Sequence, residues 1–202
     1  MSRQKSNRRQ QILETLAREL ETHPGSRITT AELAAAVGVS EAALYRHFAS
    51  KAKMFEALID FAEASVFGII NTILAQDRNP VIRCEKIIRL LLGFAERNPG
   101  ITRILLGDAL VGEHDRLRVR ANQFFERIET QFRQILREAN LSNEVRIVAP
   151  IDATASLLLA IAEGRMCRYA QGEFARRPTE HWEEQWSVLQ HALFRQNSAG
   201  PA

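Results

Sequence analysis

The segment from Ile28 to Lys51 constrains the fold of this chain more than any other, because it reads as two short helices joined by a glycine turn. Thr30 is a candidate N-cap for the first helix, since a threonine hydroxyl accepts a backbone N–H at a helix start. Gly38 takes a positive φ without steric cost, so it ends this helix and turns the backbone sharply. The apolar positions between them share one face: Leu33, Ala34 and Val37.

A second short helix is predicted after this turn, from Glu41 to about His47, with Ser40 as its N-cap. Leu44 and Phe48 are four residues apart and therefore point to the interior together. Two helices joined in this way are typical of a helix-turn-helix, whose second helix enters the major groove of DNA. The outward face of this second helix carries Ala42, Ala43, Tyr45, Arg46 and His47.

The side chains of the second helix suit contact with DNA. Small residues at its start let the backbone approach the base edges, and donors further along suit phosphate oxygens. Lys51 also opens the next helix, whose N-terminus attracts anions. Arg46 has two open roles, guanine recognition or a backbone contact, and Glu41 is expected to act in helix capping. The small residues are Ser40, Ala42 and Ala43, the phosphate donors are Tyr45, His47 and Lys51, and Thr29, Thr30 and Arg46 complete the candidate DNA-binding set. The structural alternative is a compact helical hairpin with a tyrosine on its surface.

The distribution of charge agrees with a DNA-binding N-terminal part. Residues 1–53 hold nine Lys or Arg against five Asp or Glu, whereas the rest of the chain is nearly balanced within a net charge of +3. Phosphate neutralisation by such an excess makes binding salt-dependent. The first ten residues form a basic arm that suits a DNA backbone or minor groove, or else a solvated tail before Asn7. The arm carries Arg3, Lys5, Arg8 and Arg9, and no apolar run of a signal peptide follows it.

The remainder of the chain reads as helical throughout. Helices are expected over residues 51–75, 80–98, 101–111, 115–139, 151–169 and 180–196, with a loop near 141–148 and no β alternation. We therefore predict an all-α fold with a helix-turn-helix domain over residues 1–53 and a body of about six helices over residues 54–202. Two distant cysteines, Cys84 and Cys167, favour core packing in a reduced cytoplasmic setting.

A homodimer is expected, because two heads related by a two-fold axis read a palindrome. The C-terminal helices are the candidate interface, on the apolar surface of Ala155, Leu158, Ala162, Trp182 and Trp186. The alternative is that these helices only close the core of one chain.

The motifs TTAELAAAVGVS, ALYRHF and SK, followed by a long helix, resemble the TetR family of transcriptional regulators. The resemblance to the nucleoid occlusion factors within that family extends over nearly the whole chain. It is carried by VGVSEAALYRHF, LLLGFAERNPGITRIL, DRLRVRANQFFERIE and EFARRPTEHW, and it thins between Leu141 and Asp152 and after Ala192.

This resemblance implies a protein that binds short palindromes scattered over the chromosome and, when bound there, antagonises polymerisation of the division protein FtsZ. It places the FtsZ tail in a groove between the helices of residues 51–75 and 80–98. Gly93 would leave room for a peptide backbone, and Arg97 would pair with an acidic tail. One departure is Ile69, which stands where relatives carry a basic residue. The implied FtsZ-binding residues are Phe61, Leu90, Gly93, Arg97 and Asn98.

The same residues also suit structural roles. Phe61 and Leu90 suit a helical core, Gly93 suits close helix packing, and Asn98 before Pro99 suits the end of a helix. Arg97 is the residue that packing explains least.

Three other functions compete with this hypothesis. A ligand-responsive repressor would need an apolar pocket, which the phenylalanine-rich stretch 124–132 permits. An enzyme is disfavoured, because the five histidines are far apart in the sequence and no nucleophile elbow or phosphate-binding glycine loop is found. A membrane-surface protein is disfavoured because no helix pairs the basic arm with bulky aromatics. We therefore expect no catalytic residue, metal or cofactor, and a nucleoid-associated protein of the cytoplasm that binds double-stranded DNA, FtsZ and a second copy of itself.

Overall fold

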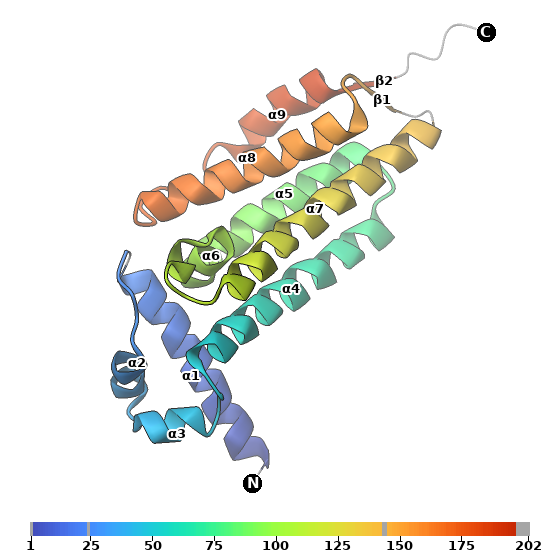
Figure 1. Ribbon diagram of the computed structural model, residues 1–202. Coiled ribbons are helices and arrows are strands. Elements are labelled where there is room, and N and C mark those ends of the chain that lie inside the picture. Colours follow the sequence, from blue (N-terminus) through green and yellow to red (C-terminus); the bar gives the residue numbers. More distant parts are fainter. Residues whose placement is uncertain (1, 24, 143–144, 197–202) are drawn as a thin grey trace, which may run out of the picture. The chain divides into compact units, whose positions relative to one another are not determined.

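The computed structural model describes residues 2–23, 25–142 and 145–196 (Figure 1). The predicted all-α fold is confirmed, with one addition, a small antiparallel strand pair in which Arg146 faces Arg195. The helices in these residues are α1 (Ser2–Thr22), α2 (Thr30–Val37), α3 (Glu41–Tyr45), α4 (Lys51–Gln76), α5 (Pro80–Arg97), α6 (Pro99–Leu106), α7 (Asp115–Ser142), α8 (Ile151–Gln171) and α9 (Trp182–Leu193). A 3-10 turn, η1 (Asp108–Leu110), follows α6, and the strands are β1 (Val145–Ile147) and β2 (Phe194–Gln196).

The chain divides into two compact units that interrupt each other in sequence. The N-terminal unit combines Met1–Ser65 with Arg97–Gln123, and the C-terminal unit combines Val66–Glu96 with Phe124–Ala202. The helix-turn-helix therefore shares its unit with α6, η1 and the first part of α7. A domain boundary at residue 53 stays a prediction.

The N-cap of α2 is Thr29, so the expectation of Thr30 is wrong by one residue. Thr29 Oγ1 accepts from Glu32 N at 3.2 Å, and Glu32 Oε2 accepts from Thr29 N at 2.8 Å. This reciprocal capping box satisfies two backbone donors, and it requires the capping residue to lie three positions before Glu32, which is where Thr29 is and Thr30 is not. The hydrogen bonds from Thr29 hold the pKa of Glu32 below its usual value.

The turn and the second helix form as predicted, except that α3 is shorter. Gly38 has a φ of 75° and Ser40 Oγ accepts from Ala43 N. Leu44 and Phe48 are buried. The helix ends at Tyr45 rather than His47, because His47 N bonds to Leu44 O, three residues back, and tightens the last turn.

The basic arm is helical, which corrects the expectation of an arm or a solvated tail. α1 begins at Ser2, so its basic residues lie on a helix. Arg9 Nη1 donates to His47 O at 2.9 Å, and its guanidinium lies 4.1 Å above the Phe48 ring. Arg9 therefore holds α1 against the end of the helix-turn-helix.

A buried arginine joins α6 to α1 in the N-terminal unit. Arg103 is only 2 % exposed, and its Nη1 donates to Leu20 O at 2.7 Å and to His23 O at 3.2 Å. Its Nε donates to Asp108 Oδ2 at 2.6 Å. The close approach at Gly100 reinforces this contact, since a Cβ there would lie 1.9 Å from Ala17 O.

The C-terminal unit has an aromatic core. Phe124 and Phe132 are fully buried, and Phe124 meets Phe67 edge-on at 5.7 Å between ring centroids. Cys84 is a buried thiol whose pKa is raised by burial to about 12, which confirms its packing role, whereas Cys167 is half-buried. The phenylalanine-rich stretch is therefore core.

Two expectations for the C-terminal helices change. The apolar residues expected at a dimer interface, Ala155, Leu158, Ala162, Trp182 and Trp186, are buried within one chain, so these side chains pack in its core. The expected loop at 141–148 contains the end of α7 and strand β1, while residues 143–144 lie outside the described residues. β1 forms by pairing with β2, which lies some fifty residues further along the chain. A local sequence pattern does not reveal such a partner, so the segment reads as a loop.

We expect Gly100→Ala to destabilise the protein by about 3 kcal/mol, because the new methyl group meets backbone rather than a flexible side chain. Thermal unfolding should show a Tm lower by roughly 10 °C. Gly68→Ala on α4 is the matched control: its Cβ meets nothing within 4 Å. It should be neutral or slightly stabilising. Equal Tm values for the two variants would contradict the close contact of α6 with α1.

We expect Glu163→Gln to stabilise the protein at pH 7. Burial, and then the charge of Glu129, raise the pKa of Glu163 in the folded state. The folded state thus binds this proton more tightly than the unfolded chain does, and its stability falls as the pH rises through the folded pKa. Urea unfolding should find the variant more stable at pH 7, with the difference vanishing near pH 4. A difference independent of pH would contradict the raised pKa.

Candidate nucleic-acid interface

The structure gathers the predicted DNA-binding residues on α3 and on the starts of α2 and α4, all in the N-terminal unit. The exposed members are Thr29, Ser40, Ala42, Tyr45 and Arg46, and the half-buried members are Thr30, Ala43, His47 and Lys51. The exposed start of α3 offers small side chains, followed by a phenol and a guanidinium. This arrangement provides close backbone approach and donors for DNA.

A side-chain bond that the sequence did not indicate fixes α3 relative to α2. Thr30 Oγ1 donates to Glu41 Oε2 at 2.8 Å. Glu41 lies in the first turn of α3, where a carboxylate is favoured by the helix dipole, but its hydroxyl partner is on the neighbouring helix. The hydrogen bond from Thr30 therefore helps to fix the angle between α2 and α3.

His47 is only partly available for DNA. Its Nδ1 is buried and has no hydrogen-bond partner among the described residues. Its backbone oxygen is occupied by Arg9. A phosphate contact from this imidazole would therefore use Nε2.

Lys51 is paired with a carboxylate of its own chain. Its Nζ lies 2.7 Å from Glu113 Oε1, in the turn before α7, and the two side chains are 16 % and 9 % exposed. Arg27 joins the same carboxylate at 3.7 Å from its Nε. Sequence reasoning missed Glu113, which is 62 residues from Lys51 and belongs to no motif.

The residues that the resemblance assigns to FtsZ binding are divided between the two units. Phe61, Arg97 and Asn98 belong to the N-terminal unit, and Leu90 and Gly93 to the C-terminal unit. Phe61 is 47 % exposed and Leu90 is half-buried, so neither is a buried core residue.

Three of these residues share one face of α5. Leu90, Gly93 and Arg97 follow each other at intervals of three and four residues, and this face is half-buried to exposed. Asn98 is the N-cap of α6, with Pro99 in the first turn, so its predicted role at a helix boundary is confirmed.

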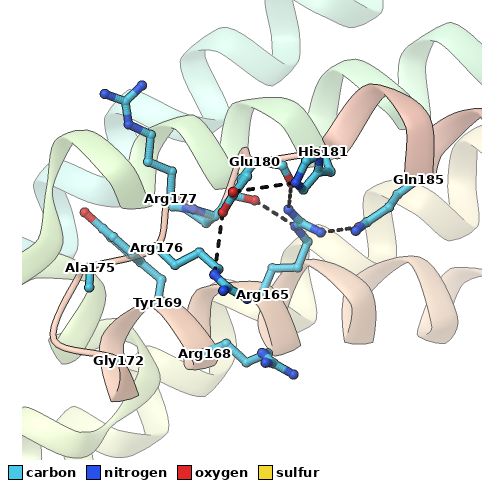
Figure 2. A pocket seen from close by; sticks show the side chains of 11 residues that line it. Arg165, Arg168, Tyr169, Gly172, Ala175, Arg176, Arg177, Glu180, His181 and Gln185 are labelled. Carbon is cyan, nitrogen blue, oxygen red and sulfur yellow. Dashed lines mark hydrogen bonds and ion pairs between the residues drawn. The ribbon is translucent and has the colours of Figure 1, made fainter.

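A cavity of about 550 Å³ lies at the connection between α8 and α9 (Figure 2). Arg165 fastens this connection, because its guanidinium donates to Pro178 O at 2.7 Å and also to Gln185 and to Glu180 O. Burial lowers the pKa of Arg165. The lining also includes Arg168, Arg176, Arg177 and His181. The four arginines of this lining distinguish the cavity from the apolar pocket that a ligand-responsive repressor was expected to form around residues 124–132.

Two family models match successive parts of the chain. Residues 12–58 match the bacterial regulatory proteins of the tetR family, and residues 78–194 match a SlmA-like model described as a tetracyclin repressor-like C-terminal domain. The head therefore belongs to a class of DNA-binding regulators, and the second match covers more than half of the chain.

Curated relatives match over nearly the full length. The nucleoid occlusion factor SlmA of Shewanella woodyi is 56 % identical, with 95 % of this chain and 97 % of that protein covered. The protein of the same name from Idiomarina loihiensis is 53 % identical, with 96 % and 98 % covered. That from Marinomonas sp. is 54 % identical over the same shares.

Solved structures of lower identity share the fold. The ketosteroid transcriptional regulator KstR2 of Mycobacterium tuberculosis has a TM-score of 0.75 at 16 % identity, covering 94 % of this chain and 96 % of that chain. The MbdR regulator of Azoarcus sp. has a TM-score of 0.76 at 18 % identity, covering 89 % and 95 %. Their likeness concerns the fold, whereas the full-length identity to the curated relatives decides the family: this chain is a member of the SlmA family of nucleoid occlusion factors, which have a TetR-type helix-turn-helix.

Proposed function

We propose that this protein binds chromosomal palindromes as a homodimer and, when bound, antagonises FtsZ assembly, so that no septum forms over the nucleoid. The observation that carries the proposal is the identity of more than half of the residues to nucleoid occlusion factors along the head and the body together. A head alone would support only a DNA-binding regulator, because the tetR-type model ends at residue 58. This role places the protein in the cytoplasm, on the nucleoid.

The DNA side of the proposal rests on the exposed start of α3. Ser40 and Ala42 are exposed and small, and Tyr45 and Arg46 follow on the same surface. The cap of Ser40 and the bond between Thr30 and Glu41 hold this surface in place, so little ordering is needed on binding.

A different face of α8 supports the dimer. Leu157, Ala160 and Gly164 are exposed at intervals of three and four residues, and Val188 is exposed on α9. Small and apolar side chains in such a row allow two helices to approach closely. A two-fold axis through this face would give the two heads that a palindrome requires.

The FtsZ side of the proposal rests on the exposed face of α5. A half-buried leucine, a glycine without a side chain and a terminal arginine are what an extended acidic peptide needs for an apolar anchor, backbone room and a charge partner. We assign these roles to Leu90, Gly93 and Arg97, whereas Phe61 and Asn98 are assigned to FtsZ binding by the family resemblance alone.

The test of the whole proposal is sedimentation of FtsZ polymer with GTP and the purified protein. It is run with and without a palindromic DNA selected from random sequence. DNA-dependent loss of polymer supports the proposal. Tight DNA binding with an unchanged amount of polymer contradicts the FtsZ part of the proposal and favours a ligand-responsive repressor.

We expect Tyr45→Ala to weaken DNA binding about tenfold, because it removes a phosphate donor and not a base contact. Fluorescence anisotropy should show the same loss for the selected palindrome and for unrelated DNA. Tyr45→Phe removes the hydroxyl and keeps the ring, and it should lose most of the affinity that Tyr45→Ala loses. A loss confined to the palindrome would contradict the phosphate role.

We expect Arg97→Asp to spare DNA binding and to weaken binding of the FtsZ tail by at least about tenfold. The substitution replaces a cation with a carboxylate, which repels the acidic tail. The measurement is titration of a labelled FtsZ tail peptide. Arg118→Asp is the matched control, because Arg118 is also an exposed helical arginine of the N-terminal unit. Unchanged peptide binding by Arg97→Asp would refute the assignment of this face.

A further inference from the structure

The turn that joins η1 to α7 places one carboxylate against two cations of the helix-turn-helix. Glu113 lies 2.7 Å from Lys51 Nζ and 3.7 Å from Arg27 Nε. Arg27 Nη2 also donates to Gly112 O at 3.0 Å. All four residues belong to the N-terminal unit, and Glu113 is nearly buried.

This carboxylate occupies a site that suits phosphate. Lys51 is the first residue of α4, and the N-terminus of a helix attracts anions. Its ammonium is largely withdrawn from solvent, with Phe55 on one side at 5.5 Å and Glu113 on the other. A phosphate that approaches Lys51 therefore competes with Glu113 for the same charge.

We propose that Glu113 is an internal substitute for a DNA phosphate, which holds Lys51 and Arg27 until DNA replaces it. The proposal rests on the DNA-binding function proposed above and adds its regulation. On binding, the cations exchange a carboxylate for phosphate oxygens, and the segment from Gly107 to Glu113 loses its ion pairs with Lys51 and Arg27. Glu113 thus lowers the affinity for DNA and makes the conformation of this turn depend on DNA.

The turn is connected to the residues assigned to FtsZ. The turn is separated from α6 only by Gly107 and η1, and the other end of α6 begins after Asn98, next to Arg97. α6 is one short helix, and Arg103 ties it to α1, so a change at its C-terminal end is carried through a single element of the same unit. The differential contact of Lys51, with Glu113 or with phosphate, supplies the free energy that any such coupling requires.

The first test uses Glu113→Gln, which keeps the shape and removes the charge. At low salt its Kd for DNA should fall about threefold to fivefold. The slope of the logarithm of the DNA-binding constant against the logarithm of the salt concentration should steepen by up to about one. In the variant, Lys51 and Arg27 neutralise phosphate without leaving the carboxylate of Glu113 unpaired. A structural role alone would move stability and not the salt slope.

Glu56→Gln is the matched control. Glu56 is a carboxylate of similar exposure on α4, and it pairs with Lys53 and Arg116 within the same unit. Its variant changes net charge equally but releases neither Lys51 nor Arg27. An equal gain in affinity for Glu56→Gln would overturn the proposal, and so would a Glu113→Gln gain that persists when Lys51 and Arg27 are both changed to Ala.

A second measurement needs no substitution. Hydrogen exchange of the unmodified protein should show faster exchange of the amides from Gly107 to His114 when DNA is bound. Unchanged or slower exchange there would overturn the proposal. Both tests use DNA and neither uses FtsZ, so a failure of the FtsZ function would not be mistaken for a failure of this inference.

Discussion

The buried guanidinium of Arg103 is the interaction on which the N-terminal unit depends. A fully desolvated arginine is costly unless its donors and charge are satisfied. Here two backbone oxygens at the end of α1 accept from it, where the helix dipole favours a positive charge, and Asp108 supplies a carboxylate. Because these partners come from α1 and from η1, the arginine makes α6 part of the same unit as the helix-turn-helix.

Local signals in the sequence predicted the elements well. Gly38, Ser40 and the apolar spacing of Leu44 and Phe48 placed the helix-turn-helix, because caps, turns and helical periodicity depend on neighbours in the chain. The capping residue is decided by one further neighbour, because the carboxylate of Glu32 reaches back to Thr29 N and so selects Thr29 over Thr30. The sequence does not predict the helical start of α1, because its basic and polar residues have no apolar periodicity there and suit an extended arm equally well.

Long-range contacts were the part that the sequence did not predict. Small and apolar residues of α8 look alike whether they face the interior or a second chain, and only the fold shows that Ala155 is buried while Leu157 is exposed. Glu113 is one of many acidic residues until its turn is placed beside Lys51. The sequence therefore predicts the donors of the candidate site, but it does not predict that Glu113 pairs with one of them, Lys51.

The interrupted course of the N-terminal unit has a consequence for protein engineering. A head cut out at residue 53 would leave behind α6, which covers Ala17 and satisfies the carbonyl oxygens of Leu20 and His23. Grafting this helix-turn-helix onto another scaffold would thus require residues 97–123 as well, or a replacement for the arginine that caps α1. The DNA specificity of this chain can be transferred to another protein only together with residues 97–123, which an alignment of the first fifty residues would not include.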